Sequence, residues 1–180
     1  MNKKHIIISM FTIAVSALVL WASSFALSKV AAENAKKEWD AMLCTLLPDS
    51  TSFTQEEFDA KEYPGILGVY QGETGFVIEA SAYGYVGDIT LLVAVDKGGT
   101  VNGLVVRDLQ ETYGLGANAF TDTAFLTQFL GTTGNAEVGS NVDALCGATV
   151  SSKAIAKAVN TAVSYVTGAD VSTGATEWGG

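Results

Sequence analysis

Residues 89–106 read ITLLVAVDKGGTVNGLVV, two β-like runs on either side of a tight turn. The runs Ile89–Val95 and Thr100–Val106 flank Asp96-Lys-Gly-Gly99, a sequence typical of a β-hairpin turn. Only Thr90 interrupts the apolar character of the first run, and this continuity predicts a strand covered on both of its faces. The stretch therefore predicts a hairpin within a mostly antiparallel sheet.

Outward from this hairpin, the pattern predicts more strands and two helices. The runs Ile66–Tyr70 and Phe76–Ala82 have β-like patterns. Residues 121–130 predict a short helix capped by Thr121 or Asp122, and residues 151–167 predict a last helix. Their expected buried positions are Phe125, Leu126, Phe129 and Leu130 in the first, and Ile155, Val159, Ala162, Val163 and Val166 in the second. The polar segment 51–62 is expected at the surface, and the whole is an α+β domain with flanking helices.

The N-terminal region predicts a membrane anchor. Residues 6–27, IIISMFTIAVSALVLWASSFAL, hold no charge, and as a helix they would span about 33 Å, enough for the hydrocarbon core. A cleaved signal peptide is the alternative, with Lys3 and Lys4 as its basic start and Ser24-Phe25-Ala26 as its cleavage site. Because the apolar core of a signal peptide usually has about 7–15 residues, the length favours a single uncleaved span.

Lysine counts on the two sides of the span do not fix its orientation. The short basic head before an apolar run resembles an export signal, which predicts that the body lies outside the cytoplasm, on the outer side of the cell membrane. We expect an anchor over 1–28, a stalk helix over 29–50, a compact domain over 51–168 and a flexible tail over 169–180.

Composition excludes several classes of function. The formal net charge of −9 argues against a nucleic-acid partner, which requires a basic face. The single histidine, His5, lies beside the N-terminus, so a histidine-based catalytic triad or a histidine-rich metal site is not expected. Two cysteines, Cys44 and Cys146, are too few for a disulfide framework or an iron–sulfur cluster.

Residues 143–152, DALCGATVSS, come directly before the last predicted helix. Gly147 permits a close backbone turn, and several hydroxyls follow it at the helix N-terminus. That end of a helix carries unsatisfied N–H groups and a positive dipole end, which suit a phosphate. The alternative is an ordinary cap, in which Thr149 or Ser151 only completes the helix.

Two glycine-containing segments accompany this motif. Glu111–Gly116, ETYGLG, suggests a tight loop that approaches a flat or bulky group, and the alternative is a plain turn. Gly84-Tyr85-Val86-Gly87 precedes the long strand and by itself suggests a turn or bulge.

Together with Leu47-Pro48, these motifs occur in the order of a known family. The chain resembles, over nearly its whole length, the covalent FMN-binding domain of the G subunit of Rnf-type membrane complexes, which transfer electrons between ferredoxin and NAD. It is also similar to the C subunit of the sodium-translocating NADH:quinone reductases.

The resemblance implies a set of site residues. FMN would be joined through a phosphoester to Ser151, with its phosphate framed by Gly147, Ala148 and Thr149. The loop would contribute Glu111, Thr112, Gly114, Leu115 and Gly116 to the flavin pocket. Asp143 would belong to the sequence recognised by an exported flavin transferase.

The resemblance further implies an electron carrier that has no catalytic residue of its own and is not a complete enzyme. Its partners would be the other membrane and peripheral subunits of an ion-translocating complex, the flavin transferase and membrane lipid. Alternatives are the C subunit of the quinone reductase, a stand-alone extracellular flavoprotein, and an anchored ligand-binding module without a cofactor.

The chain departs from the family pattern at three positions. Ser151 stands where threonine is commoner, and Cys146 stands where the family has serine or threonine. We expect Cys146 to face the pocket as a small buried residue, with a disulfide to Cys44 as the alternative. Tyr113 replaces a proline and is expected either near the flavin or exposed in the turn. A partial copy of the motif at 170–178 ends in Trp178, which has no hydroxyl, so we expect no flavin there.

Overall fold

The computed structural model describes residues 3–169 and divides into two units, Met1–Ala41 and Met42–Gly180. The tail 170–180 and its partial motif lie outside the described residues. Helix α1 runs from Lys3 to Leu46 and includes residues of both units. Within the described part of the chain, α1 is the one helix long and apolar enough to cross a membrane.

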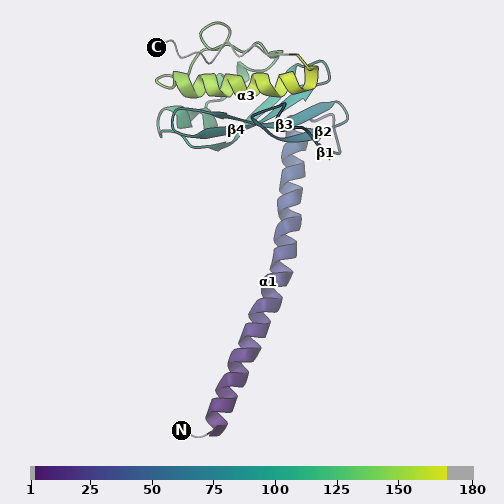
Figure 1. Ribbon diagram of the computed structural model, residues 1–180, viewed down its shortest axis with the longest axis vertical. Helices are drawn as coiled ribbons and strands as arrows, with labels where there is room; N and C mark the ends of the chain where they lie inside the picture. The colour runs from purple at the N-terminus through teal and green to yellow at the C-terminus, as the bar shows by residue number, and fades with distance from the viewer. Residues whose placement is uncertain (1–2, 170–180) are drawn as a thin grey trace. The chain divides into compact units, whose positions relative to one another are not determined.

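The second unit is built on a five-stranded sheet (Figure 1). The strands are β1 (Thr54–Glu56), β2 (Ile66–Gln71), β3 (Gly75–Tyr83), β4 (Asp88–Asp96) and β5 (Val101–Leu109). They lie in sequence order, and each neighbouring pair is antiparallel. The predicted α+β class is therefore confirmed.

The predicted hairpin joins β4 to β5. Asp96 Oδ1 accepts hydrogen bonds from the backbone N–H groups of Gly98 (2.8 Å) and Thr100 (2.9 Å). The Asp96 N–H in turn donates to the Thr100 carbonyl, 2.9 Å away. A short polar side chain that bonds the backbone two residues on is what tight turns favour, so the turn forms where the sequence predicts it.

Strand β4 is buried on both faces, as its apolar run predicts. Helix α3 (Thr149–Thr167) lies across one face of the sheet and contacts β3 and β4 (Figure 1). On β5, Gly103 admits the last turn of α1, because a Cβ atom at Gly103 would lie 2.8 Å from the Leu46 carbonyl oxygen. The main core consists of alternate residues of β3 and β4 packed against α3, and its fully buried members include Ile78, Ile89, Leu91, Val93, Val95, Ile155 and Val159.

The structure differs from the prediction at the shorter elements. Strand β1 lies inside the segment 51–62, for which the sequence predicts a surface position but no strand, because three polar residues at a sheet edge leave too short a pattern to recognise. Helix α2 covers only Thr123–Thr127 and follows a 3₁₀ turn, η1, at Gly116–Phe120. Asp122 caps α2 by accepting from the Phe125 N–H at 2.9 Å. Phe125 and Phe129 are buried, but Leu130 is exposed.

We predict that Asn160→Ala destabilises the domain by about 2–4 kcal/mol, because both backbone polar groups of Ala136 lose their partner in the interior. Asn160 is buried on α3 and accepts from the Ala136 N–H (3.0 Å) while donating to its carbonyl (2.9 Å). Urea unfolding of the full-length chain in detergent measures the change. The matched control is Asn102→Ala at an exposed position of β5, which should change the free energy of unfolding by less than about 0.5 kcal/mol.

Candidate functional site

Helix α3 begins without a side-chain cap. Its N-cap residue is Ala148, which offers no acceptor, so the interpretation of Thr149 or Ser151 as an ordinary cap is wrong. Among the described residues, no group accepts a hydrogen bond from the backbone N–H of Thr149, Val150 or Ser151. The positive end of a 19-residue helix and its free N–H groups are therefore not satisfied by a side-chain cap, an arrangement that suits an anion.

The two adjacent serines of the first turn have different roles. The Ser152 hydroxyl accepts from the Leu145 N–H (3.0 Å) and donates to the Ala148 carbonyl (2.9 Å), which ties the preceding loop to the helix. The Ser151 side chain makes no hydrogen bond with the described residues and lines a pocket instead. Ser151 thus supplies an uncommitted hydroxyl beside the uncapped helix end.

The loop 111–116 closes on this helix end. A Cβ atom at Gly116 would lie only 2.5 Å from Ser151 Oγ, so glycine is what permits the loop backbone to approach the hydroxyl. Gly147 has a φ of +72°, and a Cβ atom there would lie 2.9 Å from Leu115 Cδ2. The two predicted motifs are therefore in direct contact.

Glu111 connects the third motif to the other two. Its Oε1 accepts hydrogen bonds from the backbone N–H groups of Tyr85 (2.6 Å) and Val86 (3.4 Å). These residues form the turn between β3 and β4, where the Gly84 N–H also bonds to the Gly87 carbonyl at 2.8 Å. The carboxylate therefore fixes the β3–β4 turn against the loop that follows β5.

These segments enclose a pocket of about 450 Å³. Its lining residues are Tyr85, Glu111, Thr112, Leu115, Gly116, Gly147, Ala148, Thr149, Val150 and Ser151. The structure thus gathers every predicted flavin-binding residue except Gly114, which turns the loop with a φ of +80°. The prediction missed Tyr85 and Val150 as lining residues, although the Gly84–Gly87 motif was a signal for Tyr85.

Three other residues lie outside the pocket. Cys146 is exposed, so the expectation that it is buried against the pocket is wrong. Both cysteines are free thiols, so the disulfide is not present in this structure. Tyr113 is 96% exposed and does not line the pocket. Asp143 is also exposed, while its backbone N–H is held by Gln128 Oε1 at 2.7 Å.

The arrangement is suited to holding an anion by its phosphate end. Free N–H groups at a helix N-terminus bind phosphate, and the Ser151 hydroxyl lies in the same first turn. Of the described residues that line the pocket, Glu111 alone has a charged side chain. The described residues contain no group of three or more His, Cys, Asp or Glu side chains that could hold a metal ion.

Comparison with protein families gives a match to the FMN-binding domain over residues 84–164. The matched region begins at the β3–β4 turn and ends within α3. It therefore includes all three segments that form the pocket.

The chain is also similar to curated proteins over most of its length. It is 32% identical to the G subunit of the proton-translocating ferredoxin:NAD(+) oxidoreductase complex of Clostridium ljungdahlii, over 87% of this chain and 86% of that protein. It is 32% identical to the G subunit of the ion-translocating oxidoreductase complex of Methanosarcina acetivorans, over 89% of this chain and 93% of that protein. The corresponding protein of Vibrio vulnificus is also 32% identical, over 79% of this chain and 71% of that protein.

We predict that Glu111→Ala increases the hydrogen-exchange rates of the Tyr85 and Val86 amides by about tenfold, because a charge-assisted acceptor is removed. Exchange measured by NMR or mass spectrometry on the full-length chain tests this. Glu137→Ala removes an exposed carboxylate that does not line the pocket, and it should leave both amides unchanged. Equal exchange in the parent and Glu111→Ala would show that Glu111 does not fix the turn.

Proposed function

Because this chain belongs to the family formed by the G subunits of ion-translocating oxidoreductase complexes, we propose that it carries electrons through an FMN covalently attached to Ser151. The chain is one subunit of an oxidoreductase complex and depends on the other subunits of that complex. We take the complex to be a ferredoxin:NAD oxidoreductase, the type for which the Clostridium ljungdahlii relative is named. Bound FMN supplies the redox chemistry, and the protein supplies its position and electrostatic surroundings.

The observation that carries this proposal is the uncommitted Ser151 hydroxyl beside the uncapped end of α3. Ser151 is buried, at 1% exposure, so a phosphate would reach its hydroxyl only through the pocket that it lines, where the hydroxyl has no competing hydrogen bond from the described residues. Ser152 cannot serve, because its hydroxyl already bonds to Leu145 and Ala148 inside the domain. Thr149 lines the same pocket and is exposed, which makes it the next candidate.

The remaining pocket residues fit a phosphorylated, bulky ligand. A volume of about 450 Å³ lies within the usual range of about 300–1,000 Å³ for cofactor pockets. The N–H groups of Thr149, Val150 and Ser151 would donate to the phosphate. Thr112, Leu115 and Gly116 line the pocket from the opposing loop and would contact the rest of the ligand.

Glu111 gives the pocket a negative charge that no basic residue among the described lining residues offsets. Such a charge opposes the addition of further negative charge to a neighbouring group. Glu111 would therefore disfavour an anionic reduced form of the ligand while it fixes the β3–β4 turn.

In this proposal the anchor attaches the domain to the membrane and takes no part in ion movement. Residues 6–27 carry no ionisable side chain, so this single span offers no path for an ion. Ion movement would belong to other subunits, and the span would hold the domain at the lipid surface. With the domain on the extracytoplasmic side, a covalent bond would keep the FMN from diffusing away.

The proposed organisation is an anchor over 1–28, a stalk over 29–50, the FMN-binding domain over 51–168 and a tail over 169–180. A flavin transferase would attach the FMN and recognise Asp143. The Asp143 side chain is exposed next to a backbone that Gln128 holds in place, which suits a contact with another protein.

We predict that Ser151→Ala abolishes the flavin that remains on the chain after denaturation. The parent chain, co-produced with its transferase, should be yellow, fluoresce in a denaturing gel and have the mass of the apo chain plus FMN minus one water. Ser151→Thr should keep the adduct because it keeps the hydroxyl. Thr149→Ala serves as the matched control and should also keep it.

Retention of the full adduct in Ser151→Ala with its loss in Thr149→Ala would move the attachment to Thr149. A parent chain that stays colourless after co-production would overturn the FMN proposal in favour of a ligand-binding module without a cofactor.

We predict that Asp143→Asn lowers the flavinylated fraction by about tenfold or more, because a charged recognition contact with the transferase is lost. The urea unfolding midpoint of the apo chain should remain that of the parent, since the Asp143 side chain is exposed. Intact mass spectrometry measures the fraction. Glu137→Gln is the control at another exposed acidic position, and it should leave the flavinylated fraction unchanged. Full flavinylation of Asp143→Asn would show that the transferase does not recognise Asp143.

A further inference from the structure

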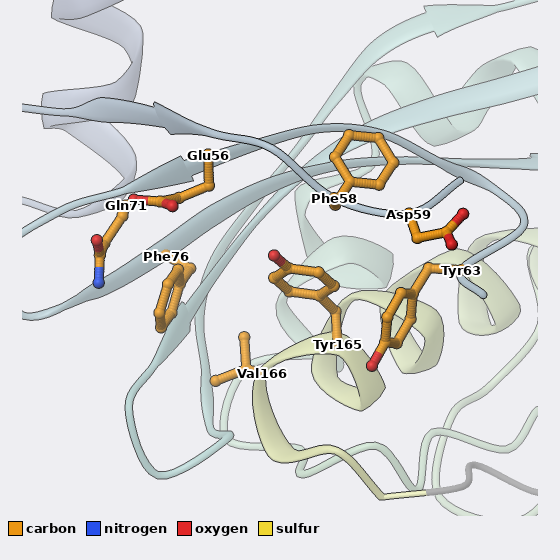
Figure 2. A pocket seen from close by; sticks show the side chains of 8 residues that line it. All are labelled: Glu56, Phe58, Asp59, Tyr63, Gln71, Phe76, Tyr165 and Val166. Carbon is orange, nitrogen blue, oxygen red and sulfur yellow. The ribbon is translucent and has the colours of Figure 1, made fainter. Parts of the chain in front are cut away.

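A second pocket, of about 390 Å³, lies near the C-terminal end of α3 (Figure 2). Among the described residues, none lines both this pocket and the pocket at Ser151. The sheet contributes Glu56 from β1, Gln71 from β2 and Phe76 from β3; the β1–β2 connection contributes Phe58, Asp59 and Tyr63; and α3 contributes Tyr165 and Val166. Tyr165 lies sixteen residues after Thr149 along α3, a rise of about 24 Å, so the two pockets are well apart.

Four aromatic rings form the walls of this second pocket. Phe58, Tyr63, Phe76 and Tyr165 are each half-buried and pack against the main core, which holds them in place. The Tyr63 and Tyr165 rings meet edge to face, with centroids 5.0 Å apart and planes at 72°. In Figure 2 the Tyr165 ring lies between Phe58 and Val166, with its hydroxyl directed toward the side of Glu56.

The charges at this pocket are acidic. Glu56 and Asp59 line it, and no lysine, arginine or histidine of the described chain does. Within the described residues, Glu56 forms no ion pair or side-chain hydrogen bond, and the one bond to the Asp59 carboxylate comes from the Lys61 backbone N–H at 2.8 Å. Burial and then the negative charge of Glu56 raise the pKa of Tyr165. The pocket is therefore negative, with no cationic side chain from residues 3–169 in its lining.

Aromatic faces together with an unpaired carboxylate are what an organic cation requires, because the ring quadrupole and the carboxylate both attract positive charge. We propose that this pocket binds the side chain of an arginine or lysine presented by a partner protein. The chain's formal net charge of −9 provides the complementary long-range attraction for a basic surface. The proposal rests on the proposed function only in that a complex subunit has partner proteins.

The position of the pocket suits this kind of contact. A partner that inserts a basic side chain at the C-terminal end of α3 leaves the Ser151 pocket at the other end uncovered. Half-buried aromatic anchors surrounded by polar residues are typical of the positions that contribute most to protein–protein binding. Phe76 and Tyr165 would contact the aliphatic stem, and Glu56 would pair with the charged head.

The experiment titrates the full-length chain, in a maltoside detergent that carries no cation, with the blocked tripeptide acetyl-Gly-Arg-Gly-amide. Ring resonances of Tyr63 and Tyr165, isotope-labelled and assigned with Tyr→Phe variants, report binding by NMR. The arginine peptide should shift both resonances saturably. The peptide with neutral citrulline in place of arginine should bind at least about fivefold more weakly, because it keeps the shape but not the charge.

Variants of the chain test the assignment to these residues. Glu56→Gln should weaken binding of the arginine peptide by about threefold to fivefold, and Tyr165→Leu should do the same, whereas Tyr165→Phe keeps the ring and should resemble the parent. Glu57→Gln is the matched control, since Glu57 is the neighbouring exposed carboxylate and does not line the pocket. It should change the affinity by less than about twofold.

Equal binding of the arginine and citrulline peptides, or equal effects of Glu56→Gln and Glu57→Gln, would overturn the proposal. Tighter binding of phosphocholine than of the arginine peptide would also overturn it, by identifying a lipid headgroup as the occupant. The comparison of the arginine and citrulline peptides uses only the parent chain. It therefore tests the proposal even if a variant fails to fold. Flavin content, measured after denaturation on the same samples, reports separately on the FMN proposal.

Discussion

The site depends on the burial of the apolar face of α3 against β3 and β4. Ile155, Val159 and Ala162 are fully buried on this face, and the alternate residues of β4 meet them from the sheet. A helix is stiff over 19 residues, so fixing its middle fixes both of its ends. This one packing contact therefore determines where the first turn meets the loop 111–116 and where Tyr165 meets the β1–β2 connection.

The first turn of α2 has a side-chain cap, whereas the first turn of α3 has none. In α2 the Asp122 carboxylate accepts from the Phe125 N–H and satisfies the first turn. In α3 the N-cap is alanine, although serines and a threonine stand within four residues of it. Because a side-chain cap contributes about 0.5–2 kcal/mol to stability, the chain gives up that stabilisation at the position where a phosphate would supply the missing acceptors.

Much of this architecture could be predicted from the sequence, because its signals are local. The β4–β5 hairpin follows from an apolar run, a turn of Asp and Gly residues and a second run, and the burial of both faces of β4 follows from the continuity of its apolar residues. The short edge strand β1 was missed, since three polar residues carry no periodicity. The exposure of Cys146 was also missed, because a residue in a loop gives no pattern that shows which way its side chain points.

The sequence by itself determined which chemical groups are present and which segments are helix or strand, since these depend on residue type and on spacing along the chain. Only the tertiary structure decided that Ser151 is uncommitted while Ser152 is bonded inside the domain. Successive residues of a helix point about 100° apart, so neighbours with the same chemistry face different surroundings. Those surroundings come from segments such as Glu111–Gly116 and the β3–β4 turn, which are far away along the chain and are brought together by the packing of the core.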